Sequence, residues 1–348
     1  MVPIVTSSQW KGCLAASAVI IGGYVAWKML KPDSRNVKLL SARELQKAKW
    51  QHVGKVKKVW LYPVTSCAPL DLYAALAAVR AGLEELTSSL RDRSYAVVND
   101  SPKYSVVTGR MCPQMVFIKP SLDENGDLTL SYSGRDPLCI TKASRQQGPI
   151  KISEIEGRTV EGVDCGDEAA AWLQSVLQRP VRLLHFNEDV NKSTRVPNPP
   201  TPVTLPLLQP GDSDSNADLT GYSLLSMASV EQLQGPGKSY AALRFRPNIL
   251  VDSDDKASCG KLRPHQEDEW RYIKIGEMAI FRNVKPCTRC TFVCVDPDTG
   301  KKDPNLEPLK TLQRTRMRKP WSEPLFAIMM SLQTRGVVRE EDPVYVLY

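Results

Sequence analysis

The segment MAIFRNVKPCTRCTFVC, residues 278–294, joins a strand-like run to a cluster of three cysteines. Its first half is rich in apolar and aromatic side chains, which is typical of β-strands. Its second half holds Cys287, Cys290 and Cys294 in a C-x2-C-x3-C pattern. The segment therefore predicts a strand that leads directly into a thiol-bearing loop.

Similar short runs recur on both sides of this segment and are bounded by Pro, Gly or polar clusters, so we expect most of the chain to form strands. The expected strands are residues 53–64, 94–99, 104–108, 115–119, 127–133, 179–186, 242–246, 248–252, 270–276, 325–332 and 344–348. Helices are expected at 166–178 and at 229–234, where Ser229 and Gln232 form a capping-box pattern. Gly276–Glu277 predicts a tight hairpin. The predicted fold class is α+β, mainly β, with two β-rich barrel-like domains behind a single N-terminal transmembrane helix.

Composition excludes several classes of protein. The 348 residues allow about two domains. With only three histidines, a multi-histidine metal centre is not expected, and nine irregularly spaced cysteines predict a reducing compartment rather than a disulfide framework. The net charge of +8 leaves an anionic membrane or an acidic protein partner open. No Lys/Arg run is interleaved with aromatic residues, so we expect no nucleic-acid partner.

Residues 12–27 carry no charge and predict a short membrane span. The run is shorter than the roughly 20 residues of a typical span, so a core helix or a signal-peptide core stays open. Trp10 and Trp27 bracket it like an aromatic belt, and most nearby Lys and Arg residues follow it. The excess of positive charge after the run predicts an anchor whose large C-terminal part faces the cytosol.

Changes in composition along the chain predict its domain organisation. A stretch with many prolines followed by a Ser/Asp tract is the strongest break and predicts a linker or long loop. The predicted parts are a membrane anchor at 1–31, a stem at 32–52, a β-barrel domain at 53–186, the linker at 187–218 and a second β-rich domain at 219–348.

The cysteine cluster admits several interpretations. A structural zinc site or an iron–sulfur cluster needs four ligands, and only three thiols are close in sequence. A redox dithiol would be expected at a helix start rather than after a strand. The thiols could be small buried apolar residues. Alternatively, a single thiolate could bind a soft metal whose other ligands belong to an organic cofactor.

Ordered landmarks over residues 53–348 resemble the molybdenum enzymes with MOSC domains. They include VGKVKKVWLYPVTSC, LRDRSYAVV, EGVDCGDEAAAWL, FRPNILV, PCTRCTFVCVDPDTG and DPVYVLY. With the leading anchor, the chain is similar to the family of mitochondrial amidoxime-reducing components. The resemblance implies a MOSC domain, a companion N-terminal MOSC β-barrel domain and a molybdenum cofactor (Mo-molybdopterin). It also implies the pyridoxal phosphate binding attributed to MOSC domains in general.

The resemblance implies a role for each cysteine of the cluster. Cys290 falls on the family's molybdenum ligand and would be catalytic. Cys287 would have a structural role next to this ligand, and Cys294 would pack in the interior. Thr288 and Arg289 match the loop that meets the cofactor in the family.

Further positions match residues that bind the cofactor or act in catalysis. Arg93 and Arg246 match arginines that hold the cofactor's phosphate, a task that suits the planar guanidinium fork. The other matched positions are Thr65, Ser66, Asp218, Leu219 and Thr220, among which Asp218 is expected to be catalytic. Thr65 stands where the family often has lysine, and the Leu219 side chain offers no hydroxyl.

By resemblance, the chain is an oxidoreductase of N-hydroxylated compounds such as amidoximes, hydroxylamines and N-hydroxyguanidines, with nitrite as a further candidate substrate. No G-x-G-x-x-G follows a strand, so electrons are expected to come from partner proteins. The resemblance implies that these partners are cytochrome b5 and NADH-cytochrome b5 reductase. The expected location is the mitochondrial outer membrane, with the catalytic part facing the cytosol and the peroxisomal membrane as the alternative. A molybdenum-cofactor carrier without reductase activity is the alternative function.

Overall fold

The computed structural model describes residues 39–348 apart from 80–81, 89, 156–157, 187–204, 206, 210–211, 213–219, 235–239 and 258–259. The predicted anchor at 1–31 and most of the predicted linker therefore lie outside the described residues. Among the residues described, no helix is both long and apolar enough to cross a membrane. Residues 40–348 form one compact unit.

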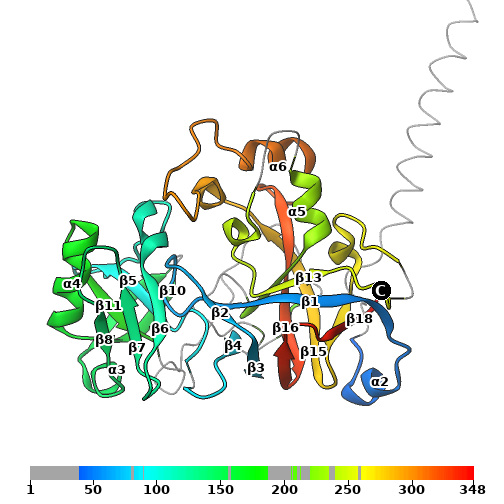
Figure 1. Ribbon diagram of the computed structural model, residues 1–348, viewed down its shortest axis with the longest axis horizontal. Helices are drawn as coiled ribbons and strands as arrows, with labels where there is room; N and C mark the ends of the chain where they lie inside the picture. The colour runs from blue at the N-terminus through cyan, green and yellow to red at the C-terminus, as the bar shows by residue number, and fades with distance from the viewer. Residues whose placement is uncertain are drawn as a thin grey trace, which may run out of the picture. The chain divides into compact units, whose positions relative to one another are not determined.

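A closed β-barrel is the main element of this unit. Its sheet has the order β13-β12-β16-β15-β14-β18-β1-β2, and an additional pairing of β13 with β1 closes seven strands into the barrel (Figure 1). Only the β12–β13 pair is parallel among these pairings. The strands are β1 (Gln51–Leu61), β2 (Leu70–Leu72), β12 (Tyr222–Ser226), β13 (Ile249–Asp252), β14 (Tyr272–Ile275), β15 (Ala279–Thr288), β16 (Leu325–Thr334) and β18 (Pro343–Leu347).

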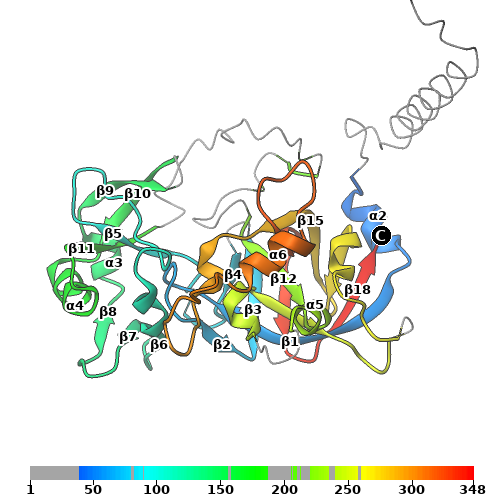
Figure 2. The same cartoon turned by 90° about the horizontal axis from the view of Figure 1, so that it is seen from above.

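Three smaller antiparallel sheets complete the unit. The four-stranded sheet has the order β5-β11-β10-β9 and carries helix α4, and both lie to one side of the barrel (Figure 2). The other two sheets have the orders β17-β3-β4 and β6-β7-β8. The strands are β3 (Ala74–Val79), β4 (Gly82–Glu84), β5 (Tyr95–Asn99), β6 (Lys119–Leu122), β7 (Leu128–Ser131), β8 (Leu138–Ile140), β9 (Ile150–Ile155), β10 (Arg158–Asp164), β11 (Val181–His185) and β17 (Gly336–Arg339).

Strands from both predicted domains share sheets. β1 belongs to the range 53–186 by prediction, yet it pairs with β13 and β18 of the barrel. In the same way β17, near the C-terminus, pairs with β3. One buried apolar cluster contains residues of both ranges, among them Val97 and Ile328. The domain boundaries themselves stay a prediction, but the two ranges are tied together by backbone hydrogen bonds.

The longest helix among the described residues confirms the prediction made from its sequence pattern. α4 (Asp167–Leu177) begins with two acidic residues, which suit the positive end of the helix dipole, and it buries an apolar face that includes Leu173 and Val176. The short helices are α2 (Ala42–Lys47), α3 (Ser144–Gln147), α5 (Met227–Leu233), α6 (Leu309–Thr315), η2 (Pro113–Phe117), η3 (Ala242–Phe245), η4 (Gln266–Glu269) and η5 (Thr291–Cys294). The fold is therefore mainly β, as predicted.

Some local predictions are wrong. Residues 115–119 were expected to be a strand, but Pro113 begins a 3-10 helix, because proline lacks the N–H that a strand would use. Residues 242–245 are also a 3-10 helix, and 104–108 contribute only an isolated bridge. The N-cap of α5 is Ser226 rather than Ser229. The hairpin at Gly276 is confirmed, since Ile275 pairs with Ala279 and Gly276 has φ of 58°.

Candidate functional site

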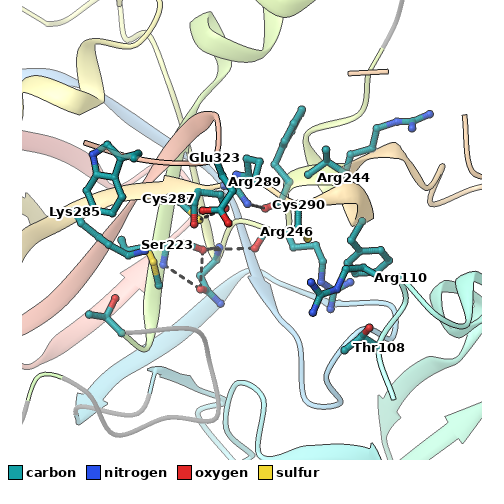
Figure 3. Close-up of a pocket in the computed structure, with 18 of the residues that line it drawn as sticks. Thr108, Arg110, Ser223, Arg244, Arg246, Lys285, Cys287, Arg289, Cys290 and Glu323 are labelled. Carbon is teal, nitrogen blue, oxygen red and sulfur yellow. Dashed lines mark hydrogen bonds between the residues drawn. The ribbon is translucent and has the colours of Figure 1, made fainter. Parts of the chain in front are cut away.

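A cavity of about 700 Å³ brings together most of the residues proposed from the sequence (Figure 3). The predicted residues that line it are Ser66, Arg93, Thr220, Arg246, Cys287, Thr288, Arg289 and Cys290. Thr65 does not line it; its backbone N–H donates to the Tyr95 carbonyl at 2.9 Å. Asp218 and Leu219 lie outside the described residues. The remaining lining residues come from segments far apart in the sequence, among them Arg110 and Glu323.

The end of β15 delivers Cys290 to this cavity. β15 ends at Thr288, and the chain then continues through Arg289 and Cys290 into η5. The Arg289 backbone N–H donates to the Pro324 carbonyl at 2.9 Å, so the chain stays paired with the segment before β16. Cys290 is exposed and has extended backbone angles. Its thiol is therefore accessible on a backbone that neighbouring hydrogen bonds fix.

The three cysteines of the cluster have different surroundings. Cys287 also lines the cavity but is only 9% exposed. Cys294 is fully buried among apolar side chains such as Phe326, and burial raises the pKa of its thiol. The cluster therefore offers one exposed thiol, Cys290, with one buried thiol at the same cavity and one in the core. No group of metal-ligand type that includes these cysteines was found among the described residues.

The cavity is strongly basic. Its lining includes one carboxylate, that of Glu323, and six cationic side chains, which are Arg93, Arg110, Arg244, Arg246, Lys285 and Arg289. Sequence analysis missed Arg110, Arg244, Lys285 and Glu323. Arg244 stands two residues before Arg246 and could have been suspected from that spacing, whereas Arg110 and Glu323 reach the cavity only through long-range pairing. The excess of positive charge favours an anionic ligand.

Arg246 and Arg93 share one aromatic platform. The Cζ atom of Arg246 lies 4.1 Å from the centroid of the Tyr62 ring, and that of Arg93 lies 5.2 Å from it. Both arginines have positive φ, 50° for Arg246 and 53° for Arg93. Arg93 forms an ion pair with buried Asp92, which in turn accepts a hydrogen bond from the Tyr62 backbone N–H at 2.8 Å. Backbone and ring contacts therefore hold both guanidinium groups in place.

Several buried polar atoms at the cavity lack a partner among the described residues. Arg246 donates through Nη1 to the Cys67 carbonyl at 2.8 Å, but its Nη2 is buried without a hydrogen bond. Arg289 donates to the carbonyls of Phe326 and Phe245, and its Nη2 is likewise unpaired. Arg244 Nη1 and Thr220 Oγ1 are also buried without a hydrogen-bond partner among the described residues. Such donors cost free energy when unpaired, so they indicate a ligand with several acceptor oxygens, such as a phosphate.

Burial also changes the pKa of Arg246. It lowers the pKa of the guanidinium to about 10, with the neighbouring Arg93 acting in the same direction. The Arg246 guanidinium stays protonated near neutral pH, but its repulsion with the Arg93 guanidinium costs free energy. An anion bound between these side chains would offset that cost.

Two family models match the chain. The model of the MOSC N-terminal beta barrel domain matches residues 53–180, and that of the MOSC domain matches residues 215–345. All the residues that line the cavity lie within the two matched ranges, whereas strand β11 lies between them.

Curated relatives match over nearly the whole chain. Mitochondrial amidoxime-reducing component 1 of Mus musculus is 31% identical, with 99% of this chain and 94% of the relative covered. Component 1 of Homo sapiens is 33% identical, with 97% and 93% covered, and human component 2 is 30% identical over the same shares. A solution structure of a Bordetella bronchiseptica protein is 21% identical at a TM-score of 0.27, with 33% of this chain and 89% of that one covered.

Proposed function

Because the chain belongs to the family of mitochondrial amidoxime-reducing components, we propose that it is a molybdenum-cofactor-dependent oxidoreductase of N-hydroxylated compounds. Amidoximes, hydroxylamines and N-hydroxyguanidines are the proposed substrates, and nitrite is a further one. The single observation that carries the proposal is the exposed Cys290 thiol in a cavity lined by six cations. A soft thiolate beside anion-binding arginines is the donor set that this cofactor needs.

The residues present fit the cofactor. Cys290 would ligate the metal, while Arg93 and Arg246 would bind the phosphate, and their unpaired or exposed N–H groups are available for it. Arg289 Nη2 and Thr220 Oγ1 would donate further hydrogen bonds to polar atoms of the cofactor. When bound, the cofactor would supply a redox-active metal that takes up the oxygen atom of the substrate.

The chain itself would bind and orient the reactants. Tyr62 and Asp92 hold the two phosphate-binding arginines in place, so that the cofactor would enter a preformed site. The Cys290 loop is fixed through the bond from Arg289 to Pro324, which restrains the thiolate. Preorganisation of this kind lowers the cost of binding.

The electron donors and the location are further parts of the proposal. We propose cytochrome b5 and NADH-cytochrome b5 reductase as electron donors, and the basic character of the chain suits an acidic electron carrier. We also propose residues 1–31 as a membrane anchor at the mitochondrial outer membrane, with the catalytic part in the cytosol. The word "mitochondrial" in the names of the relatives supports the mitochondrion as the organelle.

The experiment measures bound molybdenum and amidoxime reduction on the same full-length protein. Purified protein with about one molybdenum per chain should reduce benzamidoxime to benzamidine with a chemical electron donor. Addition of cytochrome b5, its reductase and NADH should replace the chemical donor. Molybdenum without reduction of any N-hydroxylated substrate would instead identify a cofactor carrier, and absence of molybdenum after expression in a cofactor-producing host would refute both.

A further inference from the structure

We propose that Glu323 is a substrate-binding residue that accepts hydrogen bonds from the amino group of amidoximes and N-hydroxyguanidines and so selects them over simple hydroxylamines. This inference rests on the proposed function, since it assigns a role within the same cavity. It concerns a residue that the sequence motifs did not single out.

The pairing of β15 with β16 brings together the two segments that carry Cys290 and Glu323. Thr288 pairs with Leu325, and one residue further the Arg289 N–H donates to the Pro324 carbonyl at 2.9 Å. Cys290 and Glu323 each stand one residue beyond this hydrogen-bonded pair, in the segments where β15 ends and β16 begins. Both side chains line the cavity.

The close-up is consistent with this placement. Glu323 lies with Cys287, Arg289 and Cys290 in the middle of the view, while Lys285 lies on one side and Arg244 and Arg110 on the other (Figure 3). A molecule that reacts at a metal held by Cys290 would therefore have the Glu323 carboxylate beside it.

The Glu323 carboxylate has no hydrogen-bond or ion-pair partner within the part of the chain that the structure describes. Arg289 donates through Nε and Nη1 to the carbonyls of Phe326 and Phe245 and forms no ion pair with Glu323. Glu323 is exposed, and it is the single carboxylate among the described residues that line this basic cavity. A structural ion pair therefore does not account for it.

The chemistry of the substrate class matches a carboxylate. An amidoxime carries an amino group on the carbon next to the N–OH nitrogen, and an N-hydroxyguanidine carries a further one. A carboxylate has two acceptor oxygens and can accept a pair of such N–H groups, while the N–OH group points towards the metal. An arylhydroxylamine has no such amino group, so it would gain nothing from Glu323.

The same loop supplies an apolar wall. Trp321 also lines the cavity, and its ring centroid lies 5.4 Å from Lys285 Nζ. An aromatic ring two residues before the carboxylate would pack against the aryl group of a benzamidoxime. The arrangement therefore favours aromatic amidoximes.

The test compares Glu323→Gln with the wild-type holoenzyme, using benzamidoxime and N-phenylhydroxylamine with a chemical electron donor. The control variant is Glu277→Gln, which removes an exposed carboxylate at the opposite end of β15. We expect kcat/KM for benzamidoxime to fall by about tenfold more than kcat/KM for N-phenylhydroxylamine in Glu323→Gln, mostly through KM. Glu277→Gln should keep the wild-type ratio of the two substrates.

A binding measurement separates this proposal from the proposed function. Calorimetric titration with benzamidine should show binding weakened about tenfold in Glu323→Gln and unchanged in Glu277→Gln. Equal loss for both substrates, or unchanged benzamidine binding in a variant with wild-type melting temperature and molybdenum content, would overturn the role of Glu323. A wild-type protein that reduces neither substrate would refute the proposed function, whereas the benzamidine titration would still decide whether Glu323 binds an amidine group.

Discussion

The guanidinium group of Arg246 lies against the ring of Tyr62, with 4.1 Å between Cζ and the ring centroid. Tyr62 is fully buried and directly follows β1, whereas Arg246 follows η3 near the start of the barrel's β13. The Cζ atom of Arg93 lies 5.2 Å from the centroid of the same ring. One aromatic side chain therefore positions both arginines that we assign to the phosphate.

The first prediction follows from this shared ring. Tyr62→Leu should reduce the molybdenum retained after dialysis, because both cation–π contacts, each about 0.5–2 kcal/mol, are lost. Tyr62→Phe should retain it, since the ring stays and only the hydroxyl bond to the Pro247 carbonyl disappears. Tyr272→Leu is a matched control, because Tyr272 is equally buried but belongs to a separate apolar cluster. Equal molybdenum loss in Tyr62→Leu and Tyr272→Leu would mean that general destabilisation explains the effect.

The second prediction concerns the arginines themselves. Arg93→Ala and Arg246→Ala should each lower cofactor retention, since a hydrogen bond to a charged group contributes about 1.5–3 kcal/mol. Lysine at either position should restore only part of the cofactor retention. Its ammonium group keeps the positive charge but cannot form the two parallel hydrogen bonds of a guanidinium group. Molybdenum per chain is the readout, and Arg263→Ala, which removes an exposed arginine, serves as control. Unchanged molybdenum content in both alanine variants would disprove the phosphate assignment.

The site was predictable where its residues lie in contiguous motifs. Cys290 and Arg246 stand in short segments that can be read directly, and each lines the cavity. Glu323 could not be found in this way, because its position depends on the pairing of Arg289 with Pro324. Arg110 likewise comes from a segment whose approach to the barrel is decided by tertiary packing.

The fold likewise has features that the local sequence predicts and others that depend on long-range pairing. Alternation in residues 53–64 predicted a strand, but only long-range pairing decides that β1 closes the barrel against β13. The run at 104–108 has strand-like composition yet forms a single bridge between Val106 and Val98. β17 was missed because four residues are too short a run to stand out. Long, strongly patterned elements such as β1 and α4 were therefore readable locally, whereas several short elements and the strand partners were not.

The third prediction concerns Asp212, which belongs to the predicted linker. Its carboxylate forms an ion pair with buried Arg282 of β15 and accepts a hydrogen bond from Ser331 Oγ at 2.5 Å. Asp212→Asn should lower the free energy of unfolding by about 3–5 kcal/mol, because it leaves the Arg282 charge buried without compensation. Chemical denaturation measures this, and the exposed Glu269→Gln should change it by less than about 0.5 kcal/mol. A near-neutral Asp212→Asn would show that the linker is not anchored through this pair.

The fourth prediction concerns the pH dependence of stability. Burial lowers the pKa of His185 and of His265 from 6.5 to about 4 in each case. Between these values the unfolded chain binds protons that the folded protein does not, so stability should fall as pH drops from 6.5 towards 4. Each histidine adds a slope of up to about 1.4 kcal/mol per pH unit. His185→Asn, which keeps an N–H near the Arg145 carbonyl, should lower the slope between pH 6.5 and 5 in denaturation experiments, and an unchanged slope would exclude His185.

The central claim is that Cys290 holds the catalytic metal, and the most direct measurement compares Cys290→Ser with Cys294→Ser. Both changes are equally small, but Cys290 is exposed in the cavity and Cys294 is buried in the core. Benzamidoxime reduction with a chemical donor, measured beside molybdenum content and melting temperature, should be abolished in folded Cys290→Ser and retained in Cys294→Ser, since serine is a poor ligand for a soft metal. Full activity of Cys290→Ser would contradict the account.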